Sequence, residues 1–317
     1  MLSRKNNWVI SKPKEMDAFS KMQKNSGSQA SSHMLWFFLV PSLAFMIWAG
    51  WKLVGGLKKG PETQEAHLIT SLSKVEKARS SGDRWHAAYN FAHALQRQQV
   101  SGDFDRLAQE ERTALFEKMN ILLNKFPEDI RLQRYLLLTL GQLSHPDSLP
   151  IFLKFLESSD SELRFYGAWG MIETLVKNKN LKADLYNEKI LALLKDKDPS
   201  MKKIASAYLV QQKNNTYTSA VKALLKDQDP EVQWNSAVVL ASVGDNSGKD
   251  ILKSLFEISN LHTIKYRSAK DLEQIVASAI NAARKLGDPE ILSQAESLKN
   301  SLKPTSPENR AILAGLR

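Results

Sequence analysis

The sequence contains no cysteine and none of the common catalytic signatures. Without cysteine, the chain has no disulfide, no thiolate nucleophile and no thiolate metal ligand. It also lacks the phosphate-binding patterns GxxxxGKS/T and GxGxxG, the zinc pattern HExxH and the nucleophile pattern GxSxG. We therefore predict a protein without enzymatic activity, with no catalytic residue, no cofactor, no metal and no small-molecule substrate.

One long apolar run, residues 34–57, stands out in the N-terminal part of the chain. Its first 18 residues carry no charge, and only Lys52 interrupts the remainder. At 1.5 Å per residue, a helix of this length reaches about 36 Å and can cross a hydrocarbon core of about 30 Å. Tryptophans near both ends, Trp36, Trp48 and Trp51, are typical of interfacial anchors. We predict a single transmembrane helix over 34–57, in contact with the lipid bilayer.

Two other interpretations fit the apolar run less well. A cleaved signal peptide has a shorter apolar stretch close to the N-terminus, whereas 33 residues precede this one. A buried soluble helix would be kinked by Pro41. Basic residues are nearly balanced across the run, but long domains cross membranes largely regardless of their charge. We therefore expect the tail in the cytoplasm and the large domain on the non-cytoplasmic side.

Positive charge is concentrated near the predicted membrane helix. The whole chain carries a formal net charge of +10, of which residues 60–317 hold only +3. A protein that binds duplex nucleic acid needs a basic face that neutralises many phosphates. We therefore expect the large domain to bind no nucleic acid, and the basic segment to meet anionic lipid headgroups.

Apolar spacing divides the rest of the chain. Residues 1–33 are rich in Lys, Ser, Asn and Gln, so we expect them to be mostly disordered. Residues 58–63 are expected to form a linker, and residues 304–317 a flexible C-terminal tail. Between them, residues 64–303 show apolar residues at helical spacing and no strand pattern. This large domain is predicted to be all-α.

A two-helix repeat emerges when the helix starts are aligned. DKDPSMKKIASAYL at 196–209 matches DQDPEVQWNSAVVL at 227–240, each with a capping aspartate and a proline in the first turn. If Val232 is position zero, apolar or small residues follow at plus 5 and plus 8, and a glycine at plus 12. Similar offsets place the zero positions of the other copies at Ile130, Leu163, Met201 and Ile275.

These copies resemble the HEAT-repeat family over about residues 120–300. In addition, GDRWHAAYNFAHAL at 82–95 is similar to the opening unit of bacterial HEAT-repeat proteins with an N-terminal membrane anchor. The resemblance implies an α-solenoid, a right-handed superhelix of helix pairs, in a bacterial inner (plasma) membrane protein. Polar helices at 62–80 and 288–302 are expected to cap its ends. The family's ladder of turn aspartates and basic residues is expected to lapse at Gln233, where the basic residue is missing.

The histidines and aspartates do not form a convincing metal site. His86 and His93 could share a helix face, but they lack a third ligand at suitable spacing. The two DxD pairs, at 196–198 and 227–229, lie in turns, where capping explains the second aspartate of each pair. No calcium-binding loop follows either pair.

Five side chains are candidates for a partner-binding surface. They follow position zero by one or two residues, or occupy the equivalent place in the first unit, where a helix turns away from its buried stripe. Trp and Arg are typical of binding hot spots. In the alternative interpretation, the indoles pack between repeats and the basic residues bond to turn aspartates of the next repeat. The five candidates are Trp85, Arg131, Arg164, Lys202 and Trp234.

We therefore expect a non-enzymatic, membrane-anchored scaffold that recruits protein partners along the concave face of a solenoid. One alternative is an accessory subunit of an integral membrane complex, such as a transporter or envelope machinery, in which the apolar helix itself makes contacts. Another is an enzyme, since some HEAT-type solenoids act as chromophore lyases or DNA glycosylases. The low charge of the domain argues against DNA binding, and the membrane anchor argues against both activities.

Overall fold

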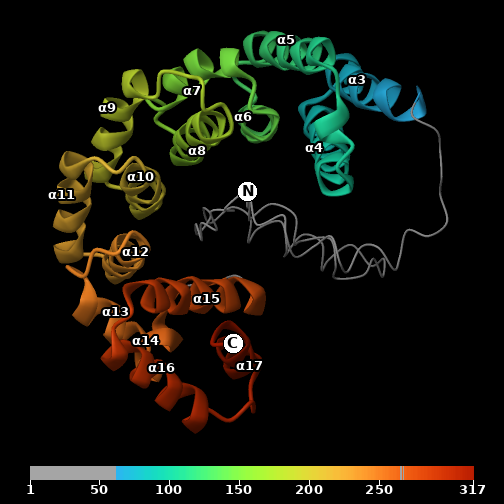
Figure 1. Cartoon of the computed structure of the whole chain (residues 1–317). Coiled ribbons are helices and arrows are strands. Elements are labelled where there is room, and N and C mark those ends of the chain that lie inside the picture. The colour runs from blue at the N-terminus through green and yellow to red at the C-terminus, as the bar shows by residue number, and fades with distance from the viewer. Residues whose placement is uncertain (1–61, 265, 267) are drawn as a thin grey trace. The chain divides into compact units, whose positions relative to one another are not determined.

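The computed structural model describes residues 62–264, 266 and 268–317 (Figure 1). These residues form α-helices joined by turns and short 3-10 helices, and no strand occurs among them. The all-α prediction is therefore confirmed for the described chain. It divides into two compact units, which we call the N-terminal unit (62–183) and the C-terminal unit (184–317).

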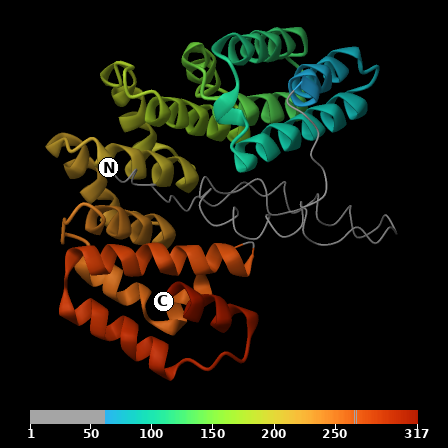
Figure 2. The same cartoon turned by 45° about the vertical axis from the view of Figure 1, so that its right-hand side comes forward.

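The N-terminal unit consists of three helix pairs. Their bounds are α3 (Glu62–Lys77) with α4 (Ser81–Ser101), α5 (Gln109–Lys125) with α6 (Ile130–Leu143), and α7 (Leu149–Phe155) with α8 (Ser161–Lys177). Two 3-10 helices, η2 (Phe104–Arg106) and η3 (Pro146–Ser148), join the pairs. The second helices α4, α6 and α8 contact one another in that order and form one face of the unit (Figures 1 and 2).

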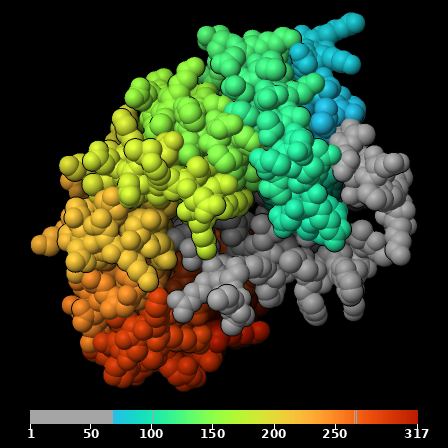
Figure 3. All heavy atoms as spheres, turned by 45° about the horizontal axis from the view of Figure 1, so that its top comes forward, coloured from blue at the N-terminus to red at the C-terminus, as the bar shows by residue number. Residues whose placement is uncertain are grey.

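The C-terminal unit continues the pattern of paired helices and ends in a small bundle. Its helices are α9 (Asp184–Ala192), α10 (Pro199–Gln211), α11 (Asn215–Ala223), α12 (Pro230–Ala241), α13 (Lys249–Leu255), α14 (Ile258–Thr263), α15 (Ala269–Leu286), α16 (Pro289–Ser301) and α17 (Pro307–Gly315), with η4 (Leu193–Lys195) and η5 (Leu224–Lys226). The second helices α10, α12 and α15 pack side by side. Neighbouring helices of each unit touch through closely packed side chains (Figure 3).

Aspartate caps set the helix starts, as the sequence pattern predicts. Oδ1 of Asp160, Asp198 and Asp229 each accepts a hydrogen bond from a backbone N–H two or three residues ahead, at 2.8 Å. Pro199 and Pro230 occupy the first positions of α10 and α12. A missing N–H is harmless there, because the first turn of a helix has no internal acceptor for it.

Burial confirms the predicted register of α8, α10 and α12. Their zero positions, Leu163, Met201 and Val232, are at most 3% exposed. The residues five positions later are small and fully buried: Ala168, Ser206 and Ala237. Small side chains at this place let the next helix approach closely.

In α6, the register lies two residues later than predicted. Ile130 is 38% exposed, whereas Leu132 is fully buried and is followed at plus 5 and plus 8 by the fully buried Leu137 and Leu140. The N-cap of α6 is Asp129, three residues before Leu132, which matches the spacing of the other copies. Gln133, and not Arg131, therefore follows position zero in this helix.

Four of the second helices are followed by a residue in the left-handed conformation. This residue lies twelve positions after position zero. Its φ is 86° at Gly244 and 70° at Gly287, the two glycines of the sequence pattern, but 53° at both Ser144 and Lys213. A left-handed residue after the last turn lets backbone N–H groups reach the free carbonyls of a helix end. The sequence pattern found only the two copies that use glycine.

The C-terminal tail predicted to be flexible at 304–317 is corrected by α17. Ser306 caps this helix, with its Oγ 3.1 Å from the backbone N of Asn309. Ala311, Ile312 and Leu316 are buried against the cluster that also contains the core residues of α15. The helix at 288–302 is therefore followed by a further helix, which packs on α15.

The predicted disordered tail 1–33 and transmembrane helix 34–57 lie outside the described residues, as does most of the linker 58–63. The end of that linker, from Glu62, already belongs to α3. Within the part of the chain that the structure describes, no helix combines the length and apolar character needed to cross a bilayer. The right-handed superhelical twist stays a prediction.

Candidate partner-binding surface

Trp85 lies between α4 and α6. Its ring is nearly parallel to that of Tyr135 on α6, with centroids 6.4 Å apart and an interplanar angle of 13°. It also stacks on His86, at 3.8 Å between centroids. The indole is half-buried. It therefore helps to join two second helices while part of its surface remains open.

Tyr89 and His93 continue this row along α4. The Tyr89 ring meets Tyr135 edge-on at 6.0 Å and His93 edge-on at 4.3 Å. We call Trp85, His86, Tyr89, His93 and Tyr135 the aromatic cluster. All but His86, which is exposed, are half-buried.

Burial disfavours the charged forms of three members of the aromatic cluster. Burial and the nearby phenol of Tyr89 raise the pKa of Tyr135 to about 12, against the opposing charge of Arg131. Burial also raises the pKa of Tyr89. Burial and the charge of Arg97 lower the pKa of His93.

The three basic candidates lie in different surroundings. Arg131 is exposed on α6 and makes no ion pair with the described residues. Arg164 is only 9% exposed, and its Nη1 donates to the carbonyls of Ser158 and Ser159 at 2.9 and 3.1 Å. Lys202 pairs with Asp227 at 2.7 Å.

Trp234 occupies the place in α12 that Trp85 occupies in α4. Each lies five residues after its N-cap, Asp229 or Ser80. Trp234 is partly buried and packs against the apolar cluster that holds Leu272 of α15. Trp85 thus contacts the next second helix, and Trp234 packs on the core of the C-terminal unit.

An ion-pair ladder crosses the starts of the second helices; the expected rung from Lys202 to Asp227 is present, but Arg131 and Arg164 take no part in it. In each rung, a basic residue five positions after the N-cap of one second helix pairs with a glutamate. That glutamate lies two positions after the N-cap of the next second helix. Two such rungs lie at 2.9 Å: Arg134 with Glu162, and Lys203 with Glu231. The sequence does show a glutamate two residues after these N-caps. Its pairing with a cation could be predicted only by knowing which helices are neighbours.

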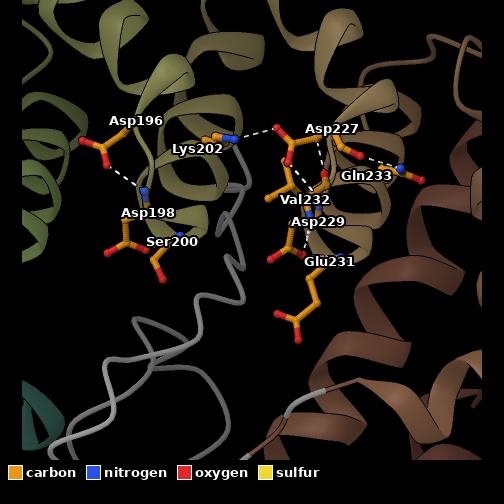
Figure 4. A network of polar contacts seen from close by, with 10 residues as sticks. Asp196, Asp198, Ser200, Lys202, Asp227, Asp229, Glu231, Val232 and Gln233 are labelled. Carbon is orange, nitrogen blue, oxygen red and sulfur yellow. Dashed lines mark hydrogen bonds and ion pairs between the residues drawn. The ribbon is translucent and has the colours of Figure 1, made fainter. Parts of the chain in front are cut away.

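Turn aspartates add further rungs to the ladder. Arg84 reaches Asp129 at 3.0 Å, and Arg134 reaches Asp160 at 2.7 Å. In Figure 4, Lys202 of α10 extends to Asp227 in the turn before α12. Burial opposes ionisation of Asp227, but hydrogen bonds from Lys202 and from backbone N–H groups outweigh it and hold the pKa of this carboxyl below its usual range.

Gln233 takes no part in this ladder, as expected. Its Nε2 donates to the carbonyl of Asp227 at 2.6 Å, within its own turn (Figure 4). Gln133 and Arg164 make the same contact six residues back, to Pro127 and Ser158. The side chain that follows position zero therefore bonds to the turn that precedes its own helix. Across the described ranges, no group of three or more His, Asp and Glu side chains is arranged to hold a metal ion.

Comparison with known proteins supports the repeat assignment. Residues 187–273 match the family model described as HEAT repeats. A search of curated proteins gives no match. Among solved structures, two engineered proteins are 15% and 16% identical with TM-scores of 0.36 and 0.35, covering 79% and 80% of this chain and 96% and 78% of theirs.

Human deoxyhypusine hydroxylase in complex with glycerol is 12% identical with a TM-score of 0.34, covering 80% of this chain and 96% of its own. At these TM-scores the likenesses carry no argument about function. The family match does coincide with α10 and α12, where the caps, prolines and buried positions follow the repeat register. The resemblance to the HEAT-repeat family is therefore confirmed over residues 187–273.

Proposed function

We propose that this chain is a non-enzymatic scaffold whose helical repeats bind protein partners. The observation that supports this most is the face formed by α4, α6 and α8, on which half-buried aromatic side chains lie beside the exposed Arg131. Stacked helix pairs provide an extended and preorganised surface, which suits recognition of other proteins. Aromatic side chains and arginine dominate the energetics of such interfaces.

We further propose that residues 34–57 hold the scaffold in a bacterial inner membrane, with the tail 1–33 in the cytoplasm and the repeats on the other side. The support is the uncharged run and its flanking tryptophans. Membranes containing the full chain should retain it after carbonate or high-salt washes, and release without detergent would contradict the anchor. Protease protection of the repeats in vesicles that expose the inner face would test the side.

The second candidate is an accessory subunit of an integral membrane complex. Small residues at the end of the apolar run, Gly50, Gly55 and Gly56, favour close packing against another membrane helix. Co-purification of the full chain from gently solubilised membranes separates the two proposals. Soluble protein partners would support the scaffold, and stoichiometric integral membrane partners would support the subunit. Recovery of no partner would contradict both.

A further inference from the structure

Two exposed arginines flank the aromatic cluster along the helix axes. Arg131 lies one turn before Tyr135 on α6, and Arg97 lies one turn after His93 on α4. Their charges act on these two neighbours, since Arg131 opposes the rise in the pKa of Tyr135 and Arg97 contributes to the fall in that of His93. Neither arginine makes an ion pair with the described residues.

The two helix stripes that hold the cluster carry almost no negative charge. On α4 the stripe runs through His86, Asn90, His93 and Arg97, and on α6 through Arg131, Tyr135, Leu138 and Gln142. The one carboxylate in line with them, Asp83, lies a turn before His86 and accepts a hydrogen bond from the Ser80 hydroxyl at 2.7 Å. Glu162 of α8 also acts on Tyr135, but it is paired with Arg134 at 2.9 Å. An aromatic centre with positive ends is complementary to a ligand with negative ends and an apolar middle.

The parallel course of α4 and α6 fixes how far apart the arginines lie. Arg84 meets Asp129 at the start of the two helices, and Gln99 donates to the carbonyl of Gln142 near their ends, both at 3.0 Å. Arg131 on α6 is therefore level with His86 on α4. His86 precedes Arg97 by 11 residues, so the two arginines are roughly 16 Å apart along the helix axis. An extended peptide covers this span with about five residues, at about 3.3 Å per residue.

A single-stranded nucleic acid would also offer negative charge and flat rings, but this face suits it less. Every nucleotide brings a phosphate, whereas the stripes of α4 and α6 supply only two arginines. The adjoining helix α8 carries Glu162, already paired with Arg134, and Glu173. A longer phosphate backbone crossing from α6 to α8 would meet these carboxylates.

We propose that the aromatic cluster binds a short acidic protein segment, with carboxylates about five residues apart held by Arg97 and Arg131 and apolar side chains between them on the aromatic rings. This rests on the proposed scaffold function and names the chemistry of its partner.

The test uses the full chain in detergent and a fluorescein-labelled peptide, GELFSLEG, whose two glutamates are five residues apart. Its matched control is GQLFSLQG, which has the same shape without the charges. Fluorescence anisotropy measures the affinity of each peptide for the native chain, for the double variant Arg97→Ala/Arg131→Ala, and for Lys154→Ala. Lys154 is an exposed cation on the outer helix α7. Thermal unfolding of each variant reports whether it is folded.

We expect the acidic peptide to bind, and the glutamine peptide to bind at least about fivefold more weakly. The double variant should lose about fivefold to tenfold in affinity for the acidic peptide with an unchanged melting temperature, while Lys154→Ala binds normally. Equal binding of the two peptides, or an unchanged affinity in the folded double variant, would overturn the proposal. So would tighter binding of a ten-nucleotide oligothymidylate than of the peptide.

Failure of this proposal is distinguishable from failure of the proposed function. Co-purification detects soluble partners of any chemistry, so partners found without peptide binding would sink only the acidic ligand. Conversely, selective peptide binding that depends on Arg97 and Arg131 would support this site even if the chain proves to be a subunit of a membrane complex.

Discussion

At the scale of single residues, Ala237 shows how little space separates neighbouring helices. It is fully buried in α12, and a Cβ added to Gly248 would lie 2.8 Å from its Cα and Cβ. Contact this close leaves no room for water, so a larger or charged side chain would displace backbone as well as side chains. Small residues at this repeat position are therefore a packing requirement.

Ala237→Asp should destabilise the C-terminal unit by more than about 3 kcal/mol, because it buries an unpaired carboxylate where only a methyl group fits. Lys226→Ala, at an exposed position before the same helix, should stay within about 0.5 kcal/mol of the native chain. Denaturant unfolding of the two variants measures this difference. Equal stabilities would show that the repeat register is wrong.

Trp234→Ala should lower the free energy of unfolding by about 2 kcal/mol, because the indole packs on the apolar core of the C-terminal unit. Trp234→Phe should lose less than half of that. Thermal unfolding checks both variants, with partner recovery per folded molecule as the second measurement. A variant that loses its partner without any loss of stability would instead identify Trp234 as a binding residue.

At the scale of helices and turns, the ladder should make stability depend on pH. The folded-state pKa of Asp227 is lowered, so its contribution is present above the unfolded value of about 4 and is lost as pH falls through the folded value. Lys202→Met should cost about 1–3 kcal/mol at pH 7 and flatten the loss of stability below about pH 4. Lys195→Met, an exposed control on η4, should leave the acid profile unchanged.

The left-handed helix ends predict two substitutions of opposite sign. Lys213→Gly should stabilise the chain by up to about 1 kcal/mol, because φ of 53° is strained for a side chain with a Cβ. Gly244→Ala, at φ of 86°, should destabilise it by about 1 kcal/mol or more. Chemical denaturation of both variants provides the check. The same sign for both would contradict the assigned helix ends.

Helix starts could be predicted where the local chemistry was complete. In α10 and α12, aspartate and proline stand together, so cap and first turn were both visible in the sequence. In α6, Pro127 lies two residues before the true cap, Asp129, and this moved the predicted register. The start of α17, with Ser306 and Pro307, carried the same kind of signal but was read as part of a tail.

The candidate surface was less accessible to sequence reasoning. Trp85 and Trp234 were correctly given equivalent places, because that depends only on the helix period. The partners of Arg134 and Lys203 lie 26 to 28 residues away on the next second helix, so they follow from which helices are neighbours. Arg164 donates to a carbonyl of the turn before its own helix, as Gln133 and Gln233 do. This shared contact is visible only in the structure.

At the scale of the whole molecule, stacked repeats should respond locally to damage. Each repeat mainly contacts its neighbours, so the cost of a substitution decays along the stack. In hydrogen exchange on the full chain, Ala237→Asp should speed exchange in α10, α12 and α15 far more than in α3 to α6. Equal acceleration throughout would mean that the described chain unfolds as one cooperative block.

The parallel second helices of the N-terminal unit also align their dipoles. The positive ends of α4, α6 and α8 lie along one edge, an arrangement that is repulsive on its own. Asp129 and Asp160 place negative charge at that edge, each capping its own helix while binding a cation from the helix before it. One carboxylate thus belongs to two repeats, and the beginning of a helix cannot be altered without disturbing its predecessor.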